Sequence, residues 1–206
     1  MSNPWTEANS VGKVRFMTVT AMLSALAFVL MFFDFSIPML IPGFVKMDLS
    51  ELPALIGTFA LGPVCGVCVC LIKNLLHLTI SSTGGIGELC NFLLGAAFVL
   101  PAGLIYQHKK TKKTAIIGGM VGAVVMGLVS FPANMFITYP VYEKLFFNGA
   151  VEPIVGMYQA ILPSVTELWQ CLWIFNAPFT LVKGLLSVII TMLIYKPLSP
   201  ILHGRH

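Results

Sequence analysis

The stretch FMTVTAMLSALAFVLMFF, residues 16–33, decides the class of this protein, because it contains no charged side chain. A helix needs about 20 predominantly apolar residues to cross the ~30 Å hydrocarbon core of a bilayer, and this run is close to that length. Lys13 and Arg15 precede the run, and no A-x-A cleavage site follows it. We therefore interpret it as a retained membrane-spanning helix rather than as a signal peptide.

The composition extends this interpretation to the whole chain of 206 residues, of which 57% are hydrophobic and 10% are charged. A soluble domain of this length needs more charge to cover its surface. In lipid, backbone polar groups must be satisfied internally, which leaves helices or a closed barrel as the spanning structures. The apolar runs here are continuous rather than alternating, so the sequence predicts an all-α membrane protein.

Further apolar segments follow the first, and we predict six transmembrane helices in a single domain that covers residues 1–206. The expected spans are 14–33, 51–61, 63–80, 88–106, 114–139 and a last one that ends near residue 195. The residues from Tyr158 to Tyr195 are too many for one straight span at about 1.5 Å per residue. Pro178 is the predicted break, because proline lacks a backbone N–H.

The placement of charge predicts the orientation, since lysine and arginine concentrate in cytoplasmic loops. With both termini cytoplasmic, the inner side holds the tail 1–13, the loop 107–113 with its four lysines, and the basic C-terminal end. The outer side then holds the longer loops 34–50 and 140–160. A lysine cluster could indicate nucleic acid, but between two spans it is better explained as a cytoplasmic loop. We therefore expect a plasma-membrane protein that contacts lipid and no nucleic acid.

Polar side chains at membrane depth are the main candidates for a binding site, because they are costly in lipid. Lys183 lies about 20 Å above the inner boundary at ~1.5 Å per residue, and we expect it to face a cavity rather than to extend to the outer headgroups. Thr180 and Asn176 follow on the same helix face. Asn134 lies at a similar depth in the fifth span. Its amide suits an interhelical hydrogen bond or a ligand, and the shared depth favours a ligand.

Weaker candidates lie near the outer ends of the helices. Gly84 and Gly85 allow the backbone to approach a ligand closely, or they form a tight turn. Glu88 and Asn91 open the fourth span, where the helix dipole alone also accounts for a carboxylate. For Lys73 and His77, which share one helix face, we expect a structural or conformational role, since charges within a membrane normally pair.

Motifs of catalysis and of nucleotide binding are absent from the sequence, including G-x-x-x-x-G-K-[ST], H-E-x-x-H and G-x-S-x-G. The C-x-x-C of Cys65 and Cys68 lies in an apolar helix without a second pair, so we interpret it as small residues at a helix contact. The sequence thus predicts neither an enzyme nor a metal site nor a resident cofactor. Any uphill transport would draw its energy from a partner or from an ion gradient.

Several stretches resemble a known family. KMDLSELPALIG, residues 46–57, resembles the first-loop-to-second-helix signature of S components of energy-coupling factor (ECF) transporters. LIKNLLH, residues 71–77, followed by TGGIGE, residues 83–88, is similar to the riboflavin-specific RibU type. AMLSA, residues 21–25, is similar to the A-x-x-x-A contact motif of the family. The resemblance covers nearly the whole chain.

This resemblance implies a six-helix, substrate-binding subunit that captures riboflavin outside the cell and delivers it inward. It implies a transmembrane coupling subunit and two ATPase subunits as partners, with Ala21 and Ala25 as a docking face. Asn134 matches a family asparagine that hydrogen-bonds the flavin, Lys183 matches a lysine on the last helix, and Thr180 occupies a place where relatives can carry asparagine. The alternatives are an S component for another vitamin and a membrane protein outside transport, such as a structural partner or an intramembrane enzyme.

Overall fold

The computed structural model describes residues 4–43, 45–81 and 83–203, and for 4–11 and 195–203 it describes the backbone alone. Its α-helices are α1 (Pro4–Met31), α2 (Glu51–Leu61), α3 (Pro63–His77), α4 (Ile86–His108), α5 (Lys112–Ala133), α6 (Tyr139–Phe146), α7 (Glu152–Gln159), α8 (Leu168–Cys171) and α9 (Ala177–His203). A 3-10 turn, η1 (Leu78–Ile80), follows α3, and two π-helical turns, η2 (Asn134–Thr138) and η3 (Leu172–Asn176), lie within the long helices. The predicted all-α class is confirmed.

Five helical stretches among the described residues are long and apolar enough to cross a membrane. They are Gly12–Met31, Pro63–Ile80, Ile86–His108, Lys112–Phe146 and Leu168–Ile194. The predicted second span coincides with α2, which is apolar but shorter. Gly62 separates α2 from α3 at a φ of 104°, a conformation that favours glycine, and Pro63 begins α3 without losing a helical hydrogen bond.

The short helix α2 lies at the centre of the bundle, where it contacts α1, α3, α4 and α9. All residues from Glu51 to Phe59 are buried. Its surroundings form an apolar core with residues of α3, α4 and α5. A helix that is apolar on all sides is expected in such an enclosed position.

Helices α4 and α5 approach each other closely because glycines of α5 face the backbone of α4. A Cβ atom added at Gly122 would lie 2.3 Å from the carbonyl oxygen of Phe98, and one at Gly118 would lie 2.7 Å from that of Ala102. Small residues at helix contacts are typical of membrane bundles, in which packing is the main attraction between helices.

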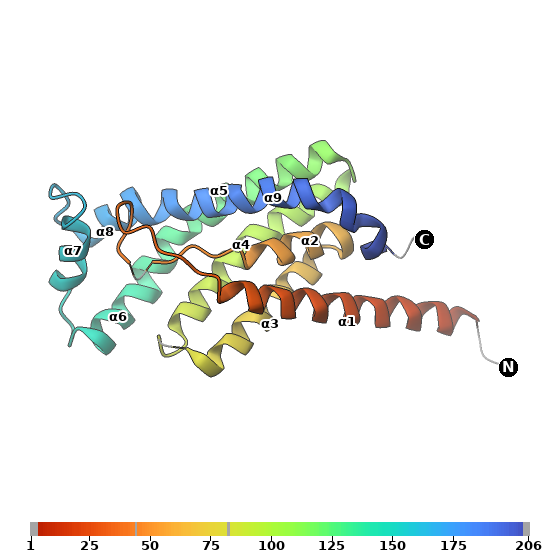
Figure 1. Ribbon diagram of the computed structural model, residues 1–206, viewed down its shortest axis with the longest axis horizontal. Coiled ribbons are helices and arrows are strands. Elements are labelled where there is room, and N and C mark those ends of the chain that lie inside the picture. Colours follow the sequence, from red (N-terminus) through yellow and green to blue (C-terminus); the bar gives the residue numbers. More distant parts are fainter. Residues whose placement is uncertain (1–3, 44, 82, 204–206) are drawn as a thin grey trace.

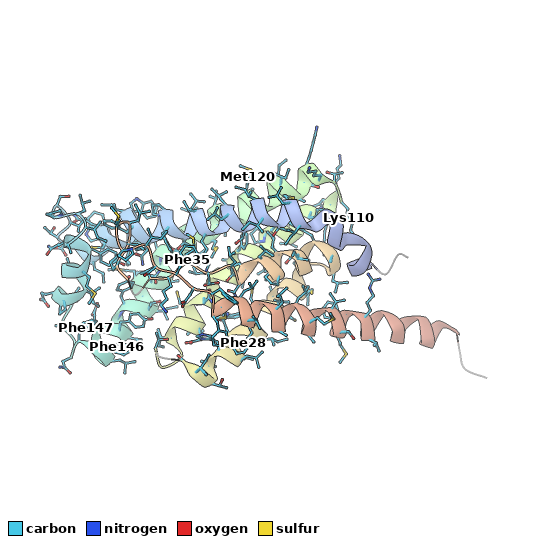
Figure 2. The ribbon with its side chains drawn as sticks, in the orientation of Figure 1. Phe28, Phe35, Lys110, Met120, Phe146 and Phe147 are labelled. Carbon is cyan, nitrogen blue, oxygen red and sulfur yellow. The ribbon has the colours of Figure 1, made fainter. Side chains whose placement is uncertain are left out.

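The bundle is elongated, with two distinct ends. The start of α1 and the end of α9 lie at one end, on the right in Figure 1, whereas α6, α7 and α8 lie at the other. Figure 2 shows Lys110, from the basic loop, at the first end and Phe146 and Phe147 at the second. The segments predicted to share the cytoplasmic side therefore lie at one end of the molecule.

Two features differ from the sequence prediction. Pro178 does not break the last span, because α9 runs through it. Instead the preceding turn, η3, is π-helical, since Pro178 cannot donate a hydrogen bond to the carbonyl of Ile174 and the helix widens there. In addition, the segment 140–160 is more regular than a loop, because it holds most of α6 and all of α7.

Candidate binding cavity

A cavity of about 530 Å³ opens in the half of the bundle that is distant from the ends of the chain. Its walls come from the end of α1, the loop after it, α3, η1, α4, α5, η2, α6, η3 and α9. The lining combines apolar side chains such as Met31, Leu94 and Phe179 with acidic, basic, amide and hydroxyl groups. This size and mixture are typical of pockets for small organic ligands.

Both π-helical turns lie against this cavity and each contributes an asparagine to its wall. Asn134 is the first residue of η2, and Asn176 is the last residue of η3. A π turn shifts the helix register by one residue and thereby redirects the side chains after it. Such turns occur often at functional sites, and here two of them, on different helices, border the same space.

Lys183 of α9 reaches the cavity and forms an ion pair there. Its Nζ donates to Oδ2 of Asp48 at 2.8 Å, and Oδ1 of Asp48 accepts from the backbone N–H of Ser50 at 2.8 Å. Burial alone would raise the pKa of the Asp48 carboxyl. The ammonium groups of Lys183 and Lys73 and the hydrogen bonds from Lys183 and Ser50 outweigh it and hold this pKa well below its ordinary value.

A second ion pair lies behind the first and is completely enclosed. Nζ of Lys73 lies 2.6 Å from Oε1 of Glu51 and 2.6 Å from Oγ of Ser50, and the side chains of Lys73 and Glu51 are 0% exposed. Because Ser50 also contacts Asp48, the two pairs form one polar chain that joins α9, the end of the loop, α2 and α3. The segment 48–51 is thus held by charge on both of its sides.

The carboxylate of Glu88 forms a third polar cluster on the wall. Its Oε1 lies 2.7 Å from Nδ1 of His77, and its Oε2 accepts from the hydroxyls of Ser81 and Thr83 at 2.9 and 3.1 Å. An ionised carboxylate can only accept, so Nδ1 of His77 carries the proton in this contact. The cluster joins the end of α3 to the start of α4 and presents a carboxylate to the cavity.

The amide of Asn134 is oriented by its own helix. Its Nδ2 donates to the backbone carbonyl of Ser130 at 2.8 Å, and the thiol of Cys90 lies 3.8 Å from its Oδ1. On the neighbouring wall, Nδ2 of Asn91 donates to Oδ1 of Asn74 at 3.3 Å. Both amides therefore have defined orientations and retain hydrogen-bonding capacity toward the cavity.

The loop between α1 and α2 covers one side of the cavity. Phe35 and Met47 exchange two backbone hydrogen bonds of 2.8–2.9 Å, which close the loop into a compact unit. Lys46 and Asp34 form an exposed ion pair beside this bridge at 2.9 Å. Ile41 is fully buried in the apolar cluster of α7 and η3, so the loop is also anchored away from its ends.

Most of the residues that the sequence nominates for a binding site lie together. Six of them line the cavity, namely Asn134, Lys183, Thr180, Asn176, Glu88 and Asn91. Gly84 and Gly85 are not among the lining residues. Both have positive φ, of 64° and 86°, and they form the turn that leads into α4, as the tight-turn interpretation expects. Ala21 and Ala25 are exposed on α1, outside the cavity.

Sequence reasoning missed the acidic partners of these residues. Asp48 belongs to the loop 34–50, which was predicted on the outer side, and Glu51 begins the second predicted span, yet both are buried against lysines. His77 has no acidic residue on its own helix, and its partner Glu88 comes from α4. A spacing rule within one helix cannot detect such pairs. The one available signal was that the sequence places lysines at membrane depth, where a charge normally pairs, without showing which carboxylates are their partners.

The cavity suits an uncharged ligand with an apolar body and several hydrogen-bonding groups. Lys46 and Lys183 on its wall each pair with a carboxylate, and His77 lies against Glu88. Among the described residues, no group of three or more His, Cys, Asp or Glu side chains could hold a metal ion, and the five cysteines are free thiols. The lining thus combines apolar surface with a few polar groups, as pockets for small organic ligands do.

Comparisons with known proteins show which family this chain is similar to. A family model described as "ECF transporter, substrate-specific component" matches residues 15–195. The riboflavin transporter RibU of Staphylococcus aureus is 37% identical over 185 residues, which cover 90% of each chain. The riboflavin transporter FmnP of Bacillus subtilis is 29% identical over 191 residues, which cover 91% of this chain and 94% of that one. A solved S component of a bacterial ECF transporter superposes with a TM-score of 0.70 at 33% identity, covering 92% of this chain and 98% of that chain.

Proposed function

Because this chain belongs to the family of ECF transporter substrate-specific components, we propose that it is the riboflavin-binding subunit of an ATP-driven vitamin uptake transporter. The observation that carries the proposal is the convergence of Lys183, Asn134 and Asn176 from different helical segments on one partly apolar cavity. An isoalloxazine ring needs an apolar pocket with a few placed donors and acceptors, and its carbonyls suit an ammonium and an amide. The names of the two curated relatives support the same ligand.

The ribityl chain of riboflavin is a row of neutral hydroxyl groups, and the remaining wall of the cavity suits it. Glu88 can accept from hydroxyls, and Asn91 and Thr180 can donate or accept. We assign the ring to the side of Lys183 and Asn134 and the ribityl chain to the side of Glu88. A ligand held in this way lies close to the loop 34–50, which then acts as a lid on the outer side. Limited proteolysis of this loop should be slower with flavin, and equal rates would count against the lid.

The membrane arrangement follows from the same proposal. Six helices span the bilayer, both termini are cytoplasmic, and the basic loop 107–113 lies on the inner side. The cavity then opens toward the outside of the cell, where a vitamin is captured. The chain lacks a nucleotide-binding motif, so transport requires a transmembrane coupling subunit and two ATPase subunits.

The exposed face of α1 around Ala21 and Ala25 is the proposed contact with the coupling subunit. Both alanines are exposed, and small residues let helices approach closely in lipid. Changing both to large residues should reduce assembly and uptake without changing flavin affinity. Normal assembly of these variants would show that the docking face lies elsewhere.

The decisive experiment is a titration of the purified protein with riboflavin, in which flavin fluorescence is the measured signal. Binding to this chain alone should quench the fluorescence, whereas proteoliposomes with this chain alone should not accumulate riboflavin. A protein that binds a different vitamin instead would be an S component of another specificity. Accumulation against a gradient by this chain alone would overturn the division of labour among the subunits.

A further inference from the structure

A closed ring of hydrogen bonds lies directly behind the cavity wall, and one of its members has no contact with the cavity. The ring consists of Asn176 in η3, Tyr139 at the start of α6 and Tyr158 in α7. Tyr158 is 0% exposed, Tyr139 is 1% exposed and Asn176 is 4% exposed. Asn176 and Tyr139 line the cavity, but Tyr158 is not among its lining residues.

The chemistry of the three groups determines the direction of every bond in the ring. The hydroxyl of Tyr158 donates its single proton to Oδ1 of Asn176 at 2.7 Å. In its short contact with Tyr139, Tyr158 must therefore accept, and the proton comes from Tyr139. The oxygen of Tyr139 in turn accepts from Nδ2 of Asn176 at 3.0 Å. Each group thus donates once and accepts once, an arrangement in which neighbouring bonds strengthen one another.

The helix α7 places the Tyr158 hydroxyl in this ring through apolar packing. Ile154, Val155 and Tyr158 are buried, whereas Gly156 and Met157 are exposed, so α7 rests one face on the outer part of the bundle. The ring of Phe175 lies 5.4 Å from that of Tyr158, measured between centroids. A helix that does not itself reach the cavity is thereby coupled to an amide that does.

We propose that Tyr158 is a positioning residue for substrate binding, which holds the Asn176 amide in the orientation that the ligand needs. This inference rests on the proposed function. One Nδ2–H and one lone pair of Oδ1 are used within the ring, so the remaining donor and acceptor of Asn176 have fixed directions. Without the Tyr158 hydroxyl, Oδ1 of Asn176 loses its partner in the ring and only the bond from Nδ2 to Tyr139 holds the amide. The amide is then less ordered, and ligand binding has to order it at a cost in free energy.

The test is a double-mutant cycle on riboflavin affinity with Tyr158→Phe and Asn176→Leu. Tyr158→Phe should weaken binding about two- to tenfold, the size of one neutral hydrogen bond. In the Asn176→Leu background the same change should cause no further loss, because the amide that Tyr158 orients is gone. Tyr106→Phe is the matched control, because Tyr106 lies near the far end of α4, where its ring packs against Phe59. The Tyr106→Phe protein should bind flavin with unchanged affinity.

The outcomes separate a positioning role from a structural one. A Tyr158→Phe protein that melts earlier but binds riboflavin with unchanged affinity overturns the proposal, as does an equal loss of affinity in both backgrounds. If Tyr158→Phe alone is too unstable to purify, Asn176→Leu is compared with Tyr158→Phe/Asn176→Leu. The proposal requires these two variants to bind riboflavin with equal affinity, so a difference between them overturns it. A wild-type protein that binds no flavin overturns the proposed function as well, whereas wild-type binding with a failed cycle overturns this inference alone.

Discussion

Two buried lysines, Lys73 in α3 and Lys183 in α9, pair with carboxylates of the same short segment, yet their surroundings differ. Lys73 pairs with Glu51 at 2.6 Å, and both side chains are 0% exposed. Lys183 pairs with Asp48 at 2.8 Å, and these side chains are 10% and 12% exposed. Only the second pair lies on the cavity wall.

The two lysines differ in how many of their hydrogen-bond donors the protein itself uses. An ammonium group has three donors. Lys73 uses two of them on Glu51 and Ser50 and is enclosed by protein. Within the described part of the chain, the Lys183 ammonium makes one hydrogen bond, to Asp48, and the side chain lines the cavity. The same residue type is thus enclosed by protein in one place and lines the cavity in the other, where the proposed function gives it a binding role.

The largest effect is expected when the enclosed pair is broken. Lys73→Met leaves the Glu51 carboxylate buried without its partner, which costs about 3–5 kcal/mol of folding stability. We expect a large fall in melting temperature or a loss of folded protein. Lys73→Met/Glu51→Gln should recover part of this loss, since no buried charge is left. A Lys73→Met protein as stable as the wild type would show that the two lysines do not differ in this way.

The Asp48–Lys183 pair should contribute less stability, and its contribution should depend on pH. Because the pKa of Asp48 is lowered in the folded protein, the contribution is present above the unfolded pKa of about 3.9 and is lost as the pH falls through the folded value. The free energy of unfolding of the wild type should therefore exceed that of Asp48→Asn by a constant margin between pH 8 and pH 5, about 1–3 kcal/mol for a buried group left without its partner. Melting curves of both proteins across this range provide the measurement. A margin that shrinks already near pH 6 would contradict the assignment.

Flavin affinity should distinguish the lysines most directly. Lys183→Met removes a charged donor to the ligand, and such a bond contributes about 1.5–3 kcal/mol, a loss of roughly ten- to a hundredfold in affinity. Titration of the folded variant with riboflavin gives this ratio. If Lys183 served only to pair with Asp48, the folded Lys183→Met protein would bind riboflavin normally, which would contradict a binding role for this residue.

The sequence predicted the helical class and the position of α2 well, because both depend on the length and continuity of apolar runs. Lys183, Asn134, Thr180 and Asn176, which it nominated for a binding site, all line the cavity, since polar groups at one depth of a bundle tend to face its interior. The partners Asp48 and Glu51 escaped prediction, because their burial results from the way α2 enters the bundle. Likewise, the π turns at 134–138 and 172–176 have no periodic signature that a sequence would reveal.

The smallest effect, and the finest test of the comparison, concerns Thr180, one turn before Lys183 on the same wall. Its side chain lines the cavity, and within the described residues its hydroxyl has no hydrogen-bond partner, so a ligand can supply one. Thr180→Val keeps the shape and removes the hydroxyl. A neutral hydrogen bond contributes about 0.5–1.5 kcal/mol, so affinity for riboflavin should fall about two- to tenfold, less than in Lys183→Met.

Thr191→Val is the matched control for Thr180→Val, because it makes the same change further along α9. Thr191 is 0% exposed, and its hydroxyl is buried without a partner in the described structure. Removing an unpaired buried hydroxyl should not lower stability, and it should leave flavin affinity unchanged because Thr191 does not line the cavity. A loss of affinity in Thr180→Val that Thr191→Val reproduces would reflect a general effect on α9. A loss confined to Thr180→Val would extend the ligand-facing surface of α9 from Lys183 to the next turn of the helix.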